Sequence, residues 1–137
     1  MKVIMTSHGD FCYGILSSYQ MIAGENPDLL AISLTEAGIQ EFSSQFEKQL
    51  AALESEELLI LTDIKGGTPY NEAYKYYLSN EEHVRVVAGM NLPMVIEVGM
   101  NLSNSSLGKL YEMAIEAGQQ GIEGAANEED QENDLDF

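Results

Sequence analysis

A histidine followed by a glycine stands eight residues into the chain, where a short apolar run ends. A neutral imidazole can attack phosphorus, and the unperturbed pKa of histidine, about 6.5, leaves much of it neutral near pH 7. Gly9 lets the chain turn into a following helix, whose first N–H groups form an anion site. We therefore predict that His8 is a phosphoryl acceptor with Gly9 beside the phosphoryl group. Position alone leaves a second interpretation, a loop histidine without a chemical role.

A carboxylate and a glycine-rich turn follow the third apolar run of the chain. An aspartate bonded to one nitrogen of an imidazole fixes the tautomer and leaves the other nitrogen to attack, so we predict that Asp63 orients His8. Gly66, Gly67 and Thr68 supply close backbone approach and a hydroxyl donor ahead of a helix-starting proline, and we predict that they bind the phosphoryl group. Taken singly, Asp63 could instead cap a turn, and the glycines could be present only because the backbone of this loop needs a positive φ.

The elements that must position these groups are indicated by apolar runs of strand length and by helical spacing between them. The predicted strands are Val3–Met5, Leu29–Leu34, Leu58–Leu61 and Val84–Ala88. The predicted helices are Tyr13–Ala23, Glu36–Leu53, Pro69–Leu78, Pro93–Gly99 and Asn104–Gly118. This alternation predicts an α/β fold, a doubly wound, open and mainly parallel sheet of order 2-1-3-4 with helices on both faces. Ligands of such sheets bind beyond the carboxyl ends of the strands, where both His8 and Asp63 are expected.

The composition narrows the class of protein and of partner. The formal net charge of −17 makes nucleic acid and anionic membrane surfaces poor partners. No apolar stretch approaches the roughly 18 residues of a membrane span, and the first apolar run is too short for a signal peptide. A single cysteine, Cys12, cannot form an internal disulfide and is expected to pack in the first helix. We predict a cytoplasmic protein without membrane insertion.

The chain is predicted to consist of one domain, residues 1–124, and an acidic tail, residues 125–137. Six of the 23 carboxylates and no cation lie in the last eleven residues, a composition typical of a disordered, solvated segment. The remaining 17 carboxylates still outnumber six basic residues, which favours a basic protein partner. No convincing fifth strand follows Gly121, so an additional C-terminal edge strand stays open.

Three motifs in this order resemble the IIA domain (EIIA, type 4) of the mannose family of the bacterial sugar phosphotransferase system. They are Ile4-Met5-Thr6-Ser7-His8-Gly9, Leu61-Thr62-Asp63-Ile64-Lys65-Gly66-Gly67-Thr68-Pro69-Tyr70-Asn71 and Val87-Ala88-Gly89-Met90-Asn91-Leu92-Pro93-Met94. The resemblance extends over residues 1 to about 124. It implies a phosphotransferase component in which Asp63 is the partner of His8 and Thr68 the hydroxyl on the phosphoryl side, with no metal and no cofactor.

The same resemblance implies partners. The general phosphocarrier protein HPr would phosphorylate His8, and a IIB component would take the phosphoryl group for a IIC/IID permease that couples transfer to sugar entry. It also implies a homodimer, in which the best-known member exchanges a C-terminal edge strand. The sugar is left open among mannose, N-acetylgalactosamine, sorbose and fructose. The second histidine, His83, is expected to have no role.

Two other functions remain possible for such a phosphohistidine. One is a regulatory module that keeps its phosphoryl group as a signal, and the other is the phosphocarrier subunit of a dihydroxyacetone kinase. Transfer to a IIB component distinguishes the regulatory module from the carrier, because a sensor would retain its phosphoryl group. The Gly66-Gly67-Thr68-Pro69 block favours the sugar carrier by resemblance.

Overall fold

Short runs rich in leucine, isoleucine and valine form the four strands of a parallel sheet. In the computed structural model, which describes residues 1–126, the strands are β1 Lys2–His8, β2 Leu29–Leu34, β3 Leu58–Thr62 and β4 Val84–Ala88. The strand order is β2-β1-β3-β4, and each neighbouring pair is parallel. This confirms the predicted order. The two central strands, β1 and β3, are therefore neighbours, and their carboxyl ends lie side by side.

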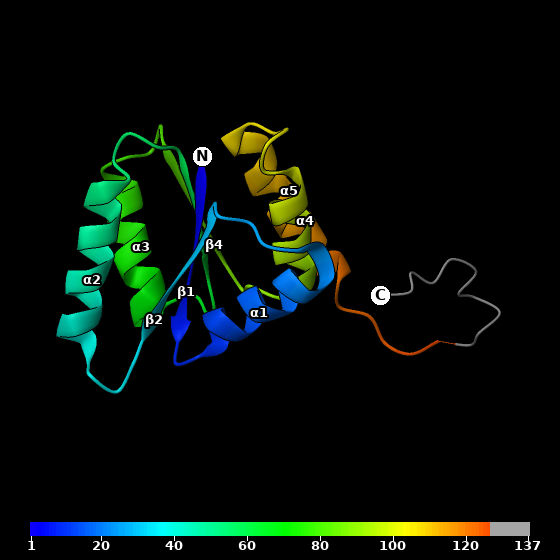
Figure 1. The fold of residues 1–137 in the computed structure, drawn as a ribbon, viewed down its shortest axis with the longest axis horizontal. Coiled ribbons are helices and arrows are strands. Elements are labelled where there is room, and N and C mark those ends of the chain that lie inside the picture. The colour runs from blue at the N-terminus through cyan, green and yellow to red at the C-terminus, as the bar shows by residue number, and fades with distance from the viewer. Residues whose placement is uncertain (127–137) are drawn as a thin grey trace.

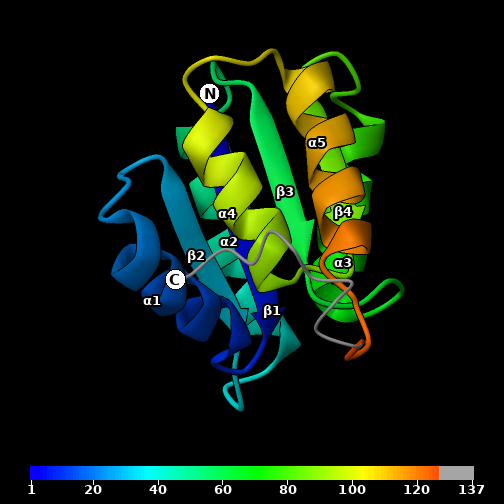
Figure 2. The same ribbon diagram turned by 90° about the vertical axis from the view of Figure 1, so that its right-hand side faces the viewer.

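Helices cover both faces of the sheet, as predicted (Figures 1 and 2). They are α1 Phe11–Ala23, α2 Ile39–Ala52, α3 Thr68–Leu78, α4 Leu92–Asn101 and α5 Leu107–Gln120. Helices α2 and α3 lie on one face, and α1, α4 and α5 lie on the other. Helices α1, α2 and α3 all begin at the end of the sheet where the arrowhead of β1 points, at the bottom of Figure 1. Their N-termini therefore surround the carboxyl ends of the strands.

Two helices begin later than their apolar spacing predicts. Helix α2 starts at Ile39 because Gly38 has a φ of 105°, a left-handed conformation that no helical residue adopts. Helix α5 starts at Leu107 because the Ser106 hydroxyl accepts a hydrogen bond from the Lys109 N–H at 3.2 Å. Such a side-chain cap replaces a partner that the first turn of a helix lacks. Local caps and turns therefore set these starts.

Separate apolar cores hold the sheet rigid from its two sides. Val3 and Met5 of β1 face the core beneath α1, α4 and α5, whereas Ile4 faces the core beneath α2 and α3. In the second core the rings of Phe42 and Phe46 stack with their centroids 5.5 Å apart. Each large side chain buried in this way stabilises the fold by roughly 1.5–3 kcal/mol. The central strands are thus well supported carriers for the residues at their ends.

The additional C-terminal edge strand that the sequence left open is not formed within the described residues, because residues 122–126 contain no strand. The prediction of a disordered tail falls mostly on residues 127–137, which lie outside the described part of the chain. Among residues 1–126, none of the helices has both the length and the hydropathy required of a membrane span.

Candidate active site

His8 and Asp63 lie next to each other at the carboxyl ends of β1 and β3. Thr6 of β1 pairs with Thr62 of β3, so His8, the last residue of β1, comes beside the residue that follows β3. The Nδ1 atom of His8 is 2.7 Å from Oδ2 of Asp63, and the backbone N–H of His8 donates to the same oxygen at 2.9 Å. The structure thus brings together the two side chains that the strand order predicts to be neighbours.

The carboxylate of Asp63 is surrounded by hydrogen-bond donors. Its Oδ1 atom accepts from the backbone N–H of Ile64 at 2.9 Å, in addition to the two contacts of Oδ2 with His8. Burial by itself would raise the pKa of Asp63, but the hydrogen bonds from His8 and Ile64 outweigh it, and the pKa lies below its ordinary value of 3.8. An ionised carboxylate only accepts hydrogen bonds, so Nδ1 of a neutral ring carries the proton and Nε2 keeps a free lone pair.

Gly67 lies against the side of the imidazole that Asp63 leaves open. A Cβ atom at Gly67 would stand 2.8 Å from Cε1 of His8 and 3.5 Å from Nε2, closer to Cε1 than real Cβ contacts come. The preceding Gly66 has a φ of 86°, which side chains rarely permit. Glycine thus suits both positions: Gly66 permits the positive φ of the turn, and Gly67 leaves room for the Cε1 side of the His8 ring.

The N-terminus of α3 follows directly from this turn. Thr68 is the first residue of α3 and Pro69 the second, and Gly67 precedes them at the cap position. The first N–H groups of a helix have no partner within the helix and carry a partial positive charge, which favours an anion. Because a Cβ atom at Gly67 would come within 2.8 Å of the His8 ring, the start of α3 lies close to that ring.

Gly9 has a structural use that its position in the sequence does not reveal. Its φ is 56°, and its N–H donates to the carbonyl of Leu34 in β2 at 2.7 Å. This hydrogen bond ties the turn after β1 to the neighbouring strand. The amide of Gly9 is thus already engaged with β2.

Two residues outside the predicted site support it. Asn71 donates from its side-chain Nδ2 to the carbonyl of Gly66 at 3.2 Å and from its backbone N–H to the carbonyl of Gly67 at 2.9 Å. It therefore turns both glycine carbonyls toward itself. Ser7 accepts through Oγ from the N–H of Cys12 at 2.8 Å and so anchors the first turn of α1. The sequence could have indicated Asn71, because it is a polar residue one helical turn after the glycine pair.

The other candidate groups are placed away from this chemistry. Cys12 is buried in α1, as predicted, and burial raises the pKa of its thiol, which makes it a poor nucleophile. His83 precedes β4 at the opposite end of the sheet. Within residues 1–126, no cluster of three or more histidine, cysteine, aspartate and glutamate side chains could hold a metal ion. The His8 side chain is 51% exposed and that of Asp63 only 15%, so the ring is open to a partner while its carboxylate is covered.

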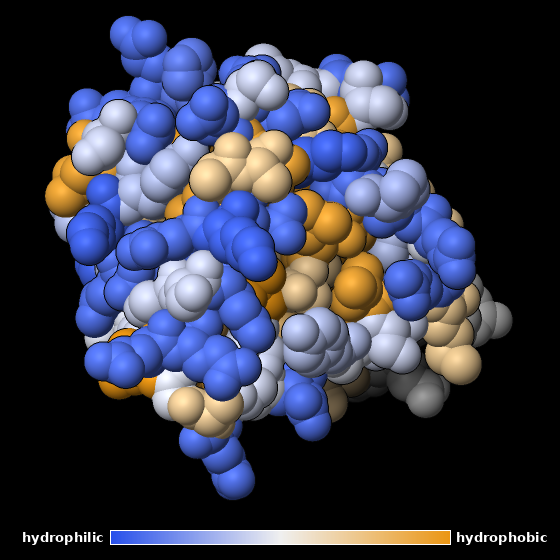
Figure 3. All heavy atoms as spheres, turned by 60° about the vertical axis from the view of Figure 1, so that its left-hand side comes forward, coloured by the Kyte–Doolittle hydropathy of each residue, from blue (hydrophilic) through white to orange (hydrophobic). Residues whose placement is uncertain are grey.

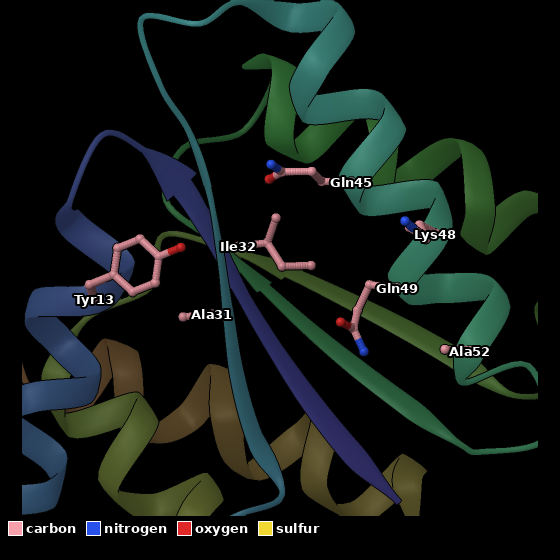
Figure 4. A pocket seen from close by; sticks show the side chains of 7 residues that line it. All are labelled: Tyr13, Ala31, Ile32, Gln45, Lys48, Gln49 and Ala52. Atoms are coloured by element: carbon pink, nitrogen blue, oxygen red, sulfur yellow. The ribbon is translucent and has the colours of Figure 1, made fainter.

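A hollow of about 380 Å³ lies apart from His8, at the free edge of β2 between α1 and α2 (Figure 4). Its lining includes Tyr13 of α1, Ala31 and Ile32 of β2, and Gln45, Lys48 and Gln49 of α2. Figure 3, which brings the α2 side of Figure 1 forward, shows apolar side chains in the middle of this face, ringed by hydrophilic ones. None of the side chains that line this hollow belongs to the pair formed by His8 and Asp63.

The chain is similar to known proteins in sequence and in fold. The family model EIIA-man, described as PTS system fructose IIA component, matches residues 2–115. The fructose-specific EIIA component of Bacillus subtilis is 37% identical over 72% of this chain and 68% of its own length. The sorbose-specific EIIA component of Lacticaseibacillus casei is 32% identical over 80% of each chain. The solved mannose/sorbose-specific IIA subunit of Enterococcus faecalis superposes with a TM-score of 0.82 at 33% identity, covering 92% of this chain and 95% of that one.

Proposed function

We propose, since this chain belongs to the EIIA-man family of sugar phosphotransferase (PTS) components, that it carries its phosphoryl group on Nε2 of His8. As an EIIA component it is a phosphocarrier of a sugar transport system. The observation that carries the assignment to His8 is the 2.7 Å contact between its Nδ1 and Asp63 Oδ2, which leaves Nε2 as the available nucleophile. The 51% exposure of this side chain supports it further.

The transfer is a displacement at phosphorus. The lone pair of Nε2 attacks the phosphoryl group of the donor and forms the new N–P bond. The bond between phosphorus and the donor atom breaks, and the donor atom keeps its electron pair. Nδ1 of His8 retains its proton throughout, so the phosphorylated ring is positively charged and is balanced by the carboxylate of Asp63. Positioning of this kind supplies much of the rate enhancement of phosphoryl transfer.

The phosphoryl oxygens would be received by the turn that Gly66 and Gly67 form and by the start of α3. A helix N-terminus stabilises an adjacent negative charge by about 0.3–1 kcal/mol at an exposed site. Thr68 adds a hydroxyl donor at that position. Gly9 remains predicted as a neighbour of the phosphoryl group through its place in the turn after His8. In this proposal Asp63 stabilises the charge of the ring, and the turn stabilises the charge of the phosphoryl group.

The partners follow from the same proposal. HPr is the phosphoryl donor and a IIB component the acceptor, with the IIC/IID permease reached only through IIB. These exchanges take place in the cytoplasm, between soluble proteins. The carrier forms a homodimer, and each of its two chains contributes one domain, residues 1–124. The relatives that match are named as specific for fructose, sorbose or mannose. In this proposal the membrane components of the system select the sugar.

The test is to incubate the full chain with phosphorylated HPr and to locate the label. We expect one phosphoryl group per chain, on Nε2 of His8, identified by peptide mapping and by the ¹⁵N shifts of the ring. Addition of the cognate IIB component should then remove the label. A label on another residue contradicts the assignment, and a label that the IIB component does not remove indicates a regulatory module instead.

A further inference from the structure

We infer that the hollow at the free edge of β2 binds a small phosphorylated sugar, at a site separate from His8. The phosphate group of this ligand would contact Lys48, and its hydroxyl groups would contact Tyr13, Gln45 and Gln49. Sugar transport by phosphoryl transfer yields a sugar phosphate, so such a ligand would report the product to its carrier. That meaning rests on the proposed function, whereas the site itself rests on the residues that line the hollow.

The hollow has the size and the floor of a small-molecule site. It lies over the edge strand, between α1 and α2 (Figure 4). Its volume of about 380 Å³ falls within the range of about 300–1,000 Å³ that is typical of such sites. Ala31 and Ile32 of β2 supply an apolar floor, and the ring of Tyr13, which is 48% exposed, borders one side. The carbon atoms of a sugar ring can pack against such a surface.

The polar side chains around this floor can donate hydrogen bonds, and none of the described lining residues is a carboxylate. Gln45 and Gln49 present amides, Tyr13 presents a hydroxyl and Lys48 an ammonium group. In Figure 4, Gln45 and Tyr13 extend toward β2 from opposite helices. Gln45 contacts Glu41 through one N–H at 3.4 Å, so its other N–H and its carbonyl oxygen can meet a ligand.

Lys48 brings a positive charge to the hollow without a carboxylate to balance it. Within residues 1–126, no carboxylate forms an ion pair with its ammonium group. The preceding residue, Glu47, lines a different cavity, which lies between α2 and α3. The formal net charge of the chain is −17, so an unbalanced cation in a hollow without carboxylates is an exception to the general charge of the surface. Such a place favours an anion.

Three other cations of the chain have different surroundings. Lys2 forms an ion pair with Asp28 at 2.6 Å. Arg85 already donates to two backbone carbonyls close to it in the sequence. Lys75 lines the cavity between α2 and α3, whose lining also includes two glutamates. Lys48 is therefore better placed than these three to bind an anion from solution.

The groups of the hollow together select the class of ligand. A phosphate group offers acceptor oxygens and negative charge to an ammonium group and to amide N–H groups. Sugar hydroxyls both donate and accept, as the amides of Gln45 and Gln49 and the hydroxyl of Tyr13 also do. Inorganic phosphate would leave the apolar floor unused, and a free sugar would leave Lys48 unused. A hexose phosphate uses all of these groups.

The test is an NMR titration of the ¹⁵N-labelled full chain with fructose 6-phosphate, fructose and inorganic phosphate. We expect fructose 6-phosphate to shift the backbone amide resonances of β2 and of residues 45–52 in α2. Fructose and inorganic phosphate should each bind about tenfold more weakly, because each lacks one set of contacts. Lys48→Gln should weaken the binding of fructose 6-phosphate about tenfold.

Lys109→Gln is the matched control. It removes the same charge from an exposed position of α5, which packs against β4 at the opposite edge of the sheet. This variant should bind fructose 6-phosphate as the unaltered chain does. Equal affinities of the Lys48→Gln and Lys109→Gln chains would overturn the site.

The remaining outcomes separate this inference from the proposed function. Shifts confined to His8 and the start of α3, or no shifts in β2 and α2, would overturn the site in the hollow. Equal binding of inorganic phosphate and fructose 6-phosphate would overturn the sugar as part of the ligand. The Lys48→Gln chain should be labelled by phosphorylated HPr at the unaltered rate, and a slower rate would contradict a site separate from His8. If the unaltered chain accepts no label but binds fructose 6-phosphate in the hollow, the proposed function fails and the binding site stands.

Discussion

The two histidines of this chain occupy opposite ends of the sheet and have different surroundings. His8 ends β1, its ring contacts Asp63, and Gly67 lies against its other side. His83 precedes β4 and is held through its backbone, since its carbonyl accepts from the Leu58 N–H at 2.8 Å and its N–H donates to the Asn80 carbonyl at 2.9 Å. No hydrogen bond joins the His83 ring to another residue of the described chain. Both side chains are exposed, so exposure does not distinguish them.

The difference teaches that an imidazole becomes a phosphoryl acceptor through its neighbours. Helices follow strands at the carboxyl end of a parallel sheet, so helix N-termini and their N–H groups gather there. At the amino end the helices present their C-termini, whose partial negative charge disfavours an anion. His8 therefore lies in a field that favours a phosphoryl group, whereas His83 does not.

The largest expected effect is on the acceptor itself. His8→Ala should abolish labelling by phosphorylated HPr, because no other ring in the described chain has both a free nitrogen and a carboxylate partner. Retention of label is measured by phosphate incorporation and mass spectrometry of the intact chain. Label on the His8→Ala chain would mean that His83 or another group accepts the phosphoryl group, and the contrast between the two histidines would be lost.

Removal of the charge beside the ring should have the next largest effect. Asp63→Asn keeps a group that can contact Nδ1 but cannot balance the positive charge of the phosphorylated ring. We expect the transfer rate to fall on the order of 100-fold, the loss that follows removal of one well-placed electrostatic group. Stopped-flow or rapid-quench single-turnover assays measure the transfer rate. A circular dichroism spectrum identical to that of the unaltered chain would show that the variant is folded. An unchanged rate would reduce Asp63 to a turn residue.

Displacement of the ring should have a smaller effect. In Gly67→Ala the added methyl group would stand 2.8 Å from Cε1 of His8, so the ring or the turn must shift. A displacement of this size is expected to slow transfer about tenfold. Gly108→Ala is the matched control, because a Cβ atom at Gly108 in α5 would meet no atom within 4 Å. Equal rates for both variants would show that room at Gly67 does not matter.

The fold and the main pair of the site could be predicted from the sequence because both depend on short runs that are mostly apolar. Strands β2 and β4 match their predicted bounds, and the strand order that follows from them places His8 beside Asp63. Strand β1 extends past Met5 because Thr6 and Ser7 are buried in it, and a pattern of apolar residues cannot detect buried polar ones. The contacts of Asn71 and Gly9 depend on turn geometry, which apolar patterns do not encode.

The contrast between the two histidines also has a consequence for stability, because only His8 has a carboxylate partner, Asp63. The pKa of Asp63 is lowered in the folded chain, so the ionised group stabilises the fold at pH values above its unfolded pKa. This contribution is lost as the pH falls through the folded pKa, below 3.8. Urea unfolding should therefore show a difference in the free energy of unfolding between the unaltered chain and Asp63→Asn that is larger at pH 7 than at pH 3. A difference that does not shrink in acid would show that the carboxylate is not stabilised by its donors.

The smallest expected effect belongs to His83. His83→Ala leaves intact the backbone hydrogen bonds by which this residue joins Leu58 and Asn80, because both use main-chain atoms. The substituted side chain is exposed, so the free energy of unfolding should change by no more than about 0.5 kcal/mol. Labelling by phosphorylated HPr and transfer to the IIB component should equal those of the unaltered chain. A slower transfer with full labelling would place His83 on a partner surface at the amino end of the sheet, and the two histidines would then share one function from opposite ends.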